Sequence, residues 1–205
     1  NAAGCEVTLL IRKDRVLSTW ERRASMTLTR ELKRRGVNVI ARTAVDRVDT
    51  GANLGATVHY RQGDSDEDRT AYGEVVLAAI GRVPNTDADW FRSSGLKLDE
   101  RGYVTVDGYG RTNLDGVWAL GDITPGHALA HRAFEQGITI AEKIDGADPK
   151  PVIDDTVPQV VFSFPEAASV GLTLDQAKAR EDVVEPKETA YPMLSNARML
   201  MSGEG

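Results

Sequence analysis

The chain has 205 residues, of which 41% are hydrophobic and 27% charged, the proportions of a water-soluble globular protein. A net charge of −6 and a pI of about 5.2 argue against a nucleic-acid-binding surface or a polybasic membrane-binding segment. No run of residues has the length and apolarity of a membrane span, and the first residues do not form a signal peptide. We therefore expect a cytoplasmic protein of one domain or two small ones, with no nucleic-acid or membrane partner.

Cysteine and histidine content limits the chemistry further. The single cysteine, Cys5, cannot form an intramolecular disulfide, and we expect it to be structural. The three histidines, His59, His127 and His131, do not stand at metal-ligand spacing, so no metal site is expected. Both ends of the chain look cut, because residues 1–4 lead directly into an apolar run and residues 199–205 stop on turn residues.

The first elements in chain order form a parallel unit. Residues 6–12 predict a buried strand, residues 21–35 a helix followed by Gly36, and residues 37–40 a second strand. Within this helix Met26, Leu28 and Leu32 are apolar. A strand, helix and strand of these lengths indicate a βαβ unit of a Rossmann-like sheet.

Three more strands follow, at about residues 44–50, 56–61 and 72–80, with turns at residues 50–55 and 63–68. Short loops between alternating strands predict an antiparallel meander. Residues 75–80 are continuously apolar, which predicts a strand covered on both faces.

The character of the sequence changes at residues 82–86, a turn-rich crossing where we place a domain boundary. Residues 117–120 predict another short buried strand, and residues 128–144 a helix. The candidate inward positions of this helix are Leu129, Phe134, Ile138, Ala141 and Ile144.

A linker at residues 146–151 precedes a strand at residues 157–164. Residues 173–176, Thr-Leu-Asp-Gln, have the capping-box pattern and open a short helix that reaches Arg180.

Asp122 is the residue whose chemistry is most suggestive. It follows a strand and precedes a helix, the place where open α/β sheets bind ligands. An ionised carboxylate accepts hydrogen bonds only, so it suits a hydroxyl-rich group such as the ribityl chain of a flavin. The unpaired amides at the start of the next helix could face a group that becomes anionic, such as a reduced flavin. A simple capping role for Asp122 explains its position equally well.

Four motifs in order carry a family resemblance. They are residues 79–86 (Ala-Ile-Gly-Arg-Val-Pro-Asn-Thr), residues 112–122 ending in Gly-Asp, residues 129–137 opening with Leu-Ala-His-Arg-Ala, and residues 157–173. Together with Asn196–Arg198 they resemble the flavoprotein disulfide reductases, and the Leu-Ala-His-Arg-Ala form is most similar to dihydrolipoamide dehydrogenases. The resemblance spans the whole chain.

The resemblance implies an α/β fold in three parts. Residues 1–81 would be a Rossmann-like three-layer part of an NAD(P)-binding domain with its antiparallel meander. Residues 82–150 would be the returning segment of an FAD-binding domain, and residues 151–205 the start of an α+β interface domain.

By the same resemblance, the flavin contacts fall on Gly121 and Asp122, for the ribityl and diphosphate region, and on Ala130, whose backbone approaches the isoalloxazine. Leu129 and His131 flank that position. His131 could be read as a catalytic base, but a helix-start or packing role is favoured, because the family's catalytic histidine lies near the end of the full protein.

The nicotinamide contacts implied by the resemblance are Ala79, Ile80, Gly81 and Arg82, with Val45 at an adenine-pocket position. Gly81 permits close backbone approach. Arg82 could reach phosphate or ribose, and a structural salt bridge is an equal alternative.

The end of the first strand bears on the choice between NAD and NADP. An NAD enzyme places an acidic residue there, whereas this chain has Ile11 followed by Arg12. A guanidinium without a competing carboxylate suits a 2′-phosphate, so the sequence favours NADPH. The glutathione reductase pattern has a second arginine six residues on, where this chain has Ser18. A solvated basic turn without discrimination is the alternative.

The resemblance implies a parent enzyme that passes electrons between a lipoyl-type dithiol and NAD(P) through FAD, working as a homodimer and associating with a 2-oxoacid dehydrogenase complex. The glycine-rich loops, paired redox cysteines and C-terminal His–Glu pair of the family are not found in these 205 residues, which alone are expected to be inactive. An NAD(P)H–quinone reductase or soluble transhydrogenase of the same fold remains an alternative. So does a non-catalytic nucleotide-binding fragment.

Overall fold

The computed structural model describes residues 1–51 and 55–202, so part of the expected turn at 50–55 and the last residues of the chain lie outside the described residues. The chain forms two compact units, residues 1–171 and residues 172–205, and each is described by itself.

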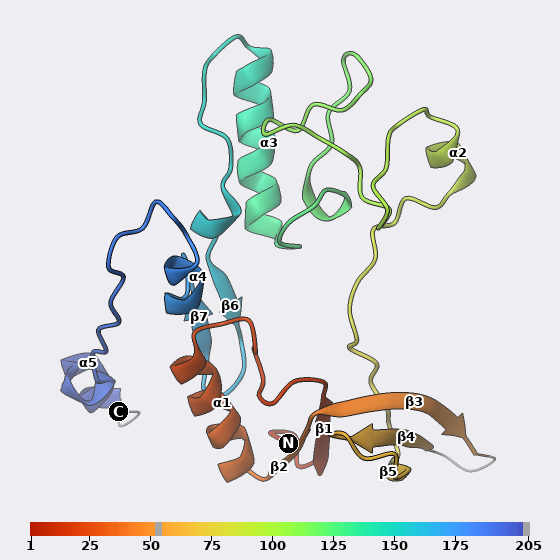
Figure 1. Ribbon diagram of the computed structural model, residues 1–205, viewed down its shortest axis with the longest axis vertical. Helices are drawn as coiled ribbons and strands as arrows, with labels where there is room; N and C mark the ends of the chain where they lie inside the picture. The colour runs from red at the N-terminus through yellow and green to blue at the C-terminus, as the bar shows by residue number, and fades with distance from the viewer. Residues whose placement is uncertain (52–54, 203–205) are drawn as a thin grey trace. The chain divides into compact units, whose positions relative to one another are not determined.

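The chain begins with the expected βαβ unit. Strands β1 (Val7–Ile11) and β2 (Val37–Ala41) pair in parallel, and helix α1 (Arg22–Arg34) connects them in the chain and lies beside them in Figure 1. The register runs from Val7 opposite Val37 to Ile11 opposite Ala41. This confirms the parallel unit and places the carboxyl end of β1 beside that of β2.

Helix α1 begins and ends where local chemistry predicts. The carboxylate of Glu21 accepts a hydrogen bond from the amide of Arg22, and Gly36 has a φ of +84°, as a residue after a helix end often does. Ser25 and Leu28 are buried, but Met26 is 52% exposed. The buried side of α1 therefore carries Ser25 and Leu28, and the apolar side chain of Met26 lies on its exposed side.

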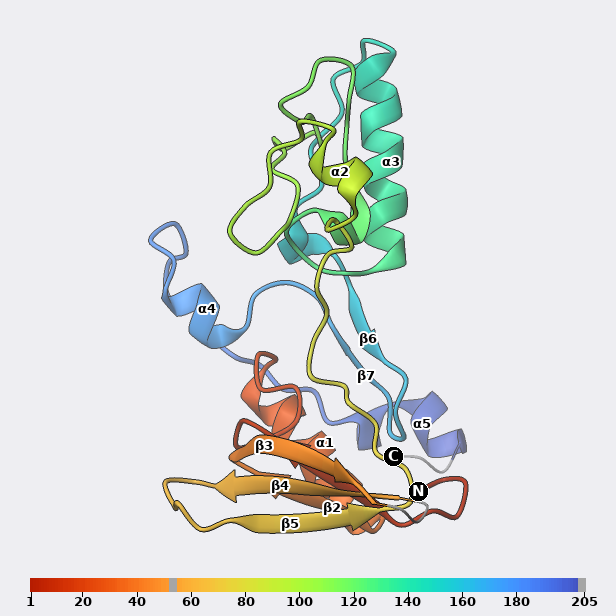
Figure 2. The ribbon, with the colours of Figure 1, turned by 90° about the vertical axis from the view of Figure 1, so that its right-hand side faces the viewer.

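An antiparallel meander follows, also as expected. Strands β3 (Thr43–Thr50), β4 (Ala56–Gln62) and β5 (Arg69–Gly73) lie side by side in that order, which Figure 2 shows edge to edge. The alternating side chains Val58 and Tyr60 of the central strand are buried, as the period of a half-buried strand requires.

The apolar run at residues 75–80 departs from expectation. The third strand ends at Gly73, and the residues after it have no regular structure. Val75 is 87% exposed and Leu77 86%, so a strand covered on both faces is wrong for this chain. A strand of that kind needs hydrogen-bonded neighbours, and none of the three described sheets extends to these residues.

Residues 82–120 are mostly irregular around a small core. The short helix α2 (Asp89–Arg92) contributes Phe91, which packs with Val104 and Ala119. Residues 117–120 make only an isolated bridge between Trp118 and Arg111, so the short strand expected there is replaced by extended backbone. Of these four residues only Ala119 is buried.

Helix α3 (Ala130–Ile144) follows the short 3₁₀ helix η1 (Gly121–Ile123). The helix is where the sequence predicts it, but its inward face is not. Phe134 is 72% exposed, whereas Arg132, Thr139 and Ile140 are buried. The other expected inward positions, Ile138, Ala141 and Ile144, are exposed too, while Leu129 before the helix is half-buried.

The first unit ends with the 3₁₀ helix η2 (Asp154–Thr156) and the antiparallel pair β6 (Gln159–Val161) and β7 (Ala167–Ser169). The strand expected at 157–164 is thus confirmed in a shorter form. Phe164 and Pro165, between the strands, are joined by a cis peptide bond.

The second unit contains α4 (Leu174–Lys178), the 3₁₀ helix η3 (Met193–Ser195) and α5 (Ala197–Ser202). The capping box at Thr173 is confirmed in both directions. The Thr173 hydroxyl accepts from the Gln176 amide, and the Gln176 side chain accepts from the Thr173 amide. None of the helices in the described part of the chain is long and apolar enough to cross a membrane.

Candidate functional site

A tight turn after the Val117–Leu120 segment presents Asp122 to solvent. Gly121 is buried with a φ of +73°, and its carbonyl accepts hydrogen bonds from the amide and hydroxyl of Thr124, at 3.0 and 2.8 Å. Asp122 lies inside this closed turn, with its side chain exposed. No hydrogen bond or ion pair to its carboxylate occurs among the described residues.

The start of α3 leaves its first amides unpaired. Leu129 is the N-cap residue with extended backbone, and no side chain caps the helix. The first intrahelical bond runs from the Ala133 amide to the Leu129 carbonyl, at 3.2 Å. The preceding amides, those of Ala130, His131 and Arg132, therefore carry the partial positive charge of the helix end.

The turn and the helix are joined directly. The Gly121 amide donates to Oε1 of Gln136, at 2.9 Å, and a side chain at Gly121 would meet Ala133 at 3.4 Å. The structure thus brings together the residues expected at a flavin, namely Gly121, Asp122, Leu129, Ala130 and His131. It also contradicts the capping interpretation of Asp122, since the N-cap of α3 is Leu129 and its amides receive no side-chain bond.

This arrangement fits the isoalloxazine and ribityl parts of FAD. An acceptor-only carboxylate that no described residue binds suits hydroxyl groups, and uncapped helix amides suit a group that gains negative charge. A cavity of about 280 Å³ lies on the other, inward side of α3, between Arg132, Gln136, Thr139 and Gly110. Thr124 and Pro125 of the loop after Asp122 also line this cavity, whereas Asp122 and Ala130 do not.

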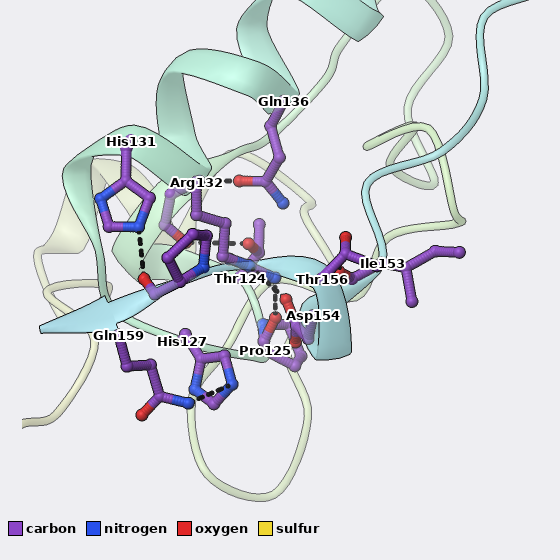
Figure 3. Close-up of polar contacts among 12 residues, drawn as sticks. Thr124, Pro125, His127, His131, Arg132, Gln136, Ile153, Asp154, Thr156 and Gln159 are labelled. Carbon is purple, nitrogen blue, oxygen red and sulfur yellow. Dashed lines mark hydrogen bonds and ion pairs between the residues drawn. The ribbon is translucent and has the colours of Figure 1, made fainter. Parts of the chain in front are cut away.

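His131 is occupied by a structural contact. Its Nε2 lies 2.7 Å from the carbonyl oxygen of Pro158, just before β6, as Figure 3 shows. A carbonyl only accepts, so Nε2 carries the proton and donates. This contact supports the packing role favoured for His131 from the sequence.

The two residues expected from the sequence to bear on the choice between NAD and NADP, Ile11 and Arg12, lie at the carboxyl end of β1. Ile11 is the last residue of the strand, and its carbonyl accepts from the Thr43 hydroxyl at 3.2 Å. Arg12 is exposed and has no polar partner among the described residues. The nearby acid, Asp14, is paired with Arg15 at 2.9 Å, so it does not compete for Arg12.

The remaining expected contacts are not gathered into one place. Val45 lies on β3 opposite Tyr60, beside a bulge, and is 48% exposed. Ala79, Ile80, Gly81 and Arg82 are exposed in a segment without regular structure. Gly81 has a φ of +141°, which explains why glycine is needed there.

A buried ion pair beside this site was missed by the sequence analysis. Arg132, 6% exposed, donates from Nε to Oδ1 of Asp154 and from Nη2 to the Pro125 carbonyl, both at 2.6 Å. Gly126 lies against both partners. The only signal in the sequence was the polar spacing of Arg132, Gln136 and Thr139, which marks a second face of the helix.

Comparison with known proteins gives a consistent picture. Residues 1–137 match the pyridine nucleotide-disulphide oxidoreductase family. The chain is 36% identical over 201 residues to a dihydrolipoyl dehydrogenase of Cupriavidus necator, covering 98% of this chain and 41% of that protein. It is 38% identical over 202 residues to the Geobacillus stearothermophilus dihydrolipoyl dehydrogenase, covering 96% and 41%.

Solved structures agree. LpdA from Mycobacterium tuberculosis superposes with a TM-score of 0.85 at 31% identity, over 98% of this chain and 42% of that one. The HOCl-induced flavoprotein disulfide reductase RclA from Escherichia coli gives 0.80 at 25% identity, over 98% and 44%. The chain therefore spans well under half the length of these relatives. By its sequence match and its fold, the chain belongs to the pyridine nucleotide-disulphide oxidoreductase family.

Proposed function

We propose that this chain is part of a flavoenzyme of the dihydrolipoamide dehydrogenase type, and that it supplies one wall of the FAD site. The observation that carries the proposal is the exposed carboxylate of Asp122, which has no polar partner in the described part of the chain and is held next to the uncapped start of α3. FAD would supply the two-electron redox chemistry, and the protein would bind and orient it.

Each residue of this wall would have a distinct task. Asp122 accepts hydrogen bonds from the ribityl hydroxyls, and Gly121 keeps the turn close to α3. The amides from Ala130 to Arg132 direct positive potential toward the flavin, which favours its reduced, more anionic form. Leu129 and His131 hold the helix start in place.

The nicotinamide side would be formed by Val45 and residues 79–82, with Ile11 and Arg12 at the 2′ position of the adenine ribose. We propose that the enzyme favours NADPH. Arg12 has no polar partner among residues 1–51 and 55–202, while the carboxylate of Asp14 is already bound by Arg15. A free guanidinium can bind a 2′-phosphate through two parallel hydrogen bonds.

The flavin proposal is tested by Asp122→Asn in the whole protein that carries this chain. We expect the wild-type protein to bind flavin, which can be followed by the flavin absorbance at about 450 nm. The Kd for FAD should rise about 10- to 100-fold in the variant, because a charge-assisted hydrogen bond is lost. The matched control is Asp115→Asn, an equal charge change at an exposed position of the same segment. A wild-type protein without flavin, or two variants with equal Kd, would contradict the proposal.

The cofactor preference is tested by the ratio of kcat/KM for NADPH and NADH. We expect a ratio above one that falls at least about tenfold in Arg12→Glu, because the variant replaces an attractive group by a repulsive one. Arg30→Glu, an equal charge change on the exposed side of α1, should leave the ratio unchanged. If Arg12→Glu also leaves it unchanged, Arg12 does not read the 2′-phosphate.

We further propose a lipoyl-type dithiol substrate, a homodimer and association with a 2-oxoacid dehydrogenase complex in the cytoplasm, as the resemblance implies. The three-part division at residues 81/82 and 150/151 belongs to the same proposal. Dihydrolipoamide oxidation by the whole protein and its mass by light scattering test the substrate and the dimer. Quinone reduction without dihydrolipoamide oxidation would favour the quinone reductase alternative.

A further inference from the structure

The buried guanidinium of Arg132 is the feature that the proposed function does not use. It lies in the first turn of α3 on the inward side, while the amides at the helix start face the candidate flavin site. Nε and Nη2 are committed to Asp154 and to the Pro125 carbonyl, and Nη1 is buried with no acceptor among the described residues. Burying a guanidinium costs free energy of folding unless its N–H groups, which have a fixed geometry, bind acceptors.

The Pro125 carbonyl belongs to the loop that carries Asp122. This loop is held to α3 at two points that are one helical turn apart. Gln136 binds the amide of Gly121, before Asp122, and Arg132 binds the carbonyl of Pro125, after it. Between them, Thr124 closes the turn onto the Gly121 carbonyl. Asp122 therefore lies in a loop whose two ends are both fixed to the helix.

The second partner of the Arg132 guanidinium, Asp154, lies outside this loop. Asp154 opens η2, and two neighbouring contacts tie the same region to the loop and helix start. His131 donates to the Pro158 carbonyl, and the Gln159 side chain lies 3.3 Å from Nε2 of His127 (Figure 3). An amide NH₂ group can only donate, so Nε2 of His127 accepts this bond.

The backbone is shaped to admit the ion pair. Gly126 has a φ of +121°, and a Cβ there would collide with Arg132 and Asp154. The loop can lie directly on the ion pair only because this residue lacks a side chain.

From these contacts we infer that Arg132 is a positioning residue, which fixes the Asp122 loop relative to the first turn of α3 and so sets the electrostatic environment of the flavin. The inference rests on the proposed function for its flavin part. Its structural part, the clamp between α3, Pro125 and Asp154, stands on the contacts alone.

The clamp is tested first by hydrogen exchange in the full chain without flavin. Arg132→Gln should raise exchange about 10- to 100-fold at the amides of Gly121 and Thr124, since a charge-assisted hydrogen bond to the loop is lost. Arg132→Lys keeps the charge but can satisfy one acceptor at a time, so we expect an intermediate value. Lys143→Gln, which removes an exposed ion pair at the other end of the same helix, should change neither amide.

The flavin part is tested in the loaded whole protein by the reduction potential of the flavin. A tenfold loss of preference for reduced flavin lowers the potential of a two-electron couple by about 30 mV. We expect a decrease of about this size in Arg132→Gln, a smaller one in Arg132→Lys, and none in Lys143→Gln. Asp154→Asn, which keeps the shape of the partner, serves if Arg132→Gln does not fold.

The outcomes separate the two proposals. Faster exchange together with a lower potential supports the inference. Faster exchange with an unchanged potential shows that Arg132 is structural only, and overturns the inference while leaving the flavin site intact. Unchanged exchange overturns the clamp itself. A wild-type protein that binds no flavin overturns the proposed function and, with it, the flavin part of this inference.

Discussion

Replacing Gly126 by alanine probes the ion pair beneath the candidate flavin site most directly. Alanine at a φ of +121° is strained by about 1–3 kcal/mol. Its methyl group would also have to displace Arg132 or Asp154, and separating a buried pair costs about 3–5 kcal/mol. Because the Asp154 side chain is 39% exposed, the lower end of that range applies. We expect a total loss of about 4–6 kcal/mol in the free energy of unfolding.

The control is Gly116→Ala, at a glycine with a φ of +73° and open space around its Cα. This change carries only the backbone strain, about 1–2 kcal/mol. In a chain of this length each kcal/mol shifts Tm by about 2–4 °C, so the two variants should differ by roughly 4 °C or more in thermal unfolding followed by circular dichroism. Equal Tm values for the two variants would refute the argument that Gly126 is required by the ion pair.

Two further changes test local features. Thr173→Ala should destabilise α4 by about 1 kcal/mol, because the amide of Gln176 loses its cap, and the chemical shifts of residues 174–178 should move toward coil values; unchanged shifts would show that the capping box is dispensable. The hydrogen bond between Lys143 and Asp148 raises the pKa of Lys143 above its ordinary 10.5 and lowers the pKa of Asp148 below its ordinary 3.8. Lys143 contributes to the stability of the folded chain below its ordinary pKa, and this contribution is lost as pH rises through the raised pKa. Asp148 contributes to stability above its ordinary pKa, and this contribution is lost as pH falls through the lowered pKa. The difference in urea midpoint between wild type and Lys143→Gln should therefore stay constant from about pH 5 to pH 9, and a slope within that window would contradict the assignment.

Local chemistry explains which parts of the fold were predictable. The βαβ unit, the meander and the capping box at Thr173 depend on residues close in sequence, and all three are confirmed. The run at residues 75–80 was different. Its apolarity shows that it can be buried, but burial as a strand depends on neighbours that a local pattern does not specify. In this chain Val75 and Leu77 remain exposed.

The residues of the candidate site also differ in whether they could be predicted from the sequence. Asp122 and the start of α3 could be identified because the turn and the helix start are close in the sequence, and the structure holds the turn against the helix. The partnership of Arg132 with Asp154 could not be, because 22 residues separate them and the pair forms only when η2 folds back against the helix. The tautomers of His127 and His131 could not be predicted either, because they depend on long-range contacts with Gln159 and with the Pro158 carbonyl.

The inward face of α3 can be decided by two equal substitutions on one helix. Ile138 was expected to be inward from the apolar pattern, but it is 54% exposed, whereas Ile140 is 8% exposed and packs near Gly110. Ile→Ala changes helix propensity by the same amount at both sites, so a difference between them reports burial. We expect Ile140→Ala to lower the free energy of unfolding of the full chain by about 2 kcal/mol, the lower end for a buried isoleucine, because a cavity already borders the side chain. Ile138→Ala should stay within about 0.5 kcal/mol of wild type. If Ile138→Ala proved the more damaging change in urea unfolding, the apolar pattern would have identified the inward face correctly. The buried polar face through Arg132 and Gln136 would then be the misassigned one.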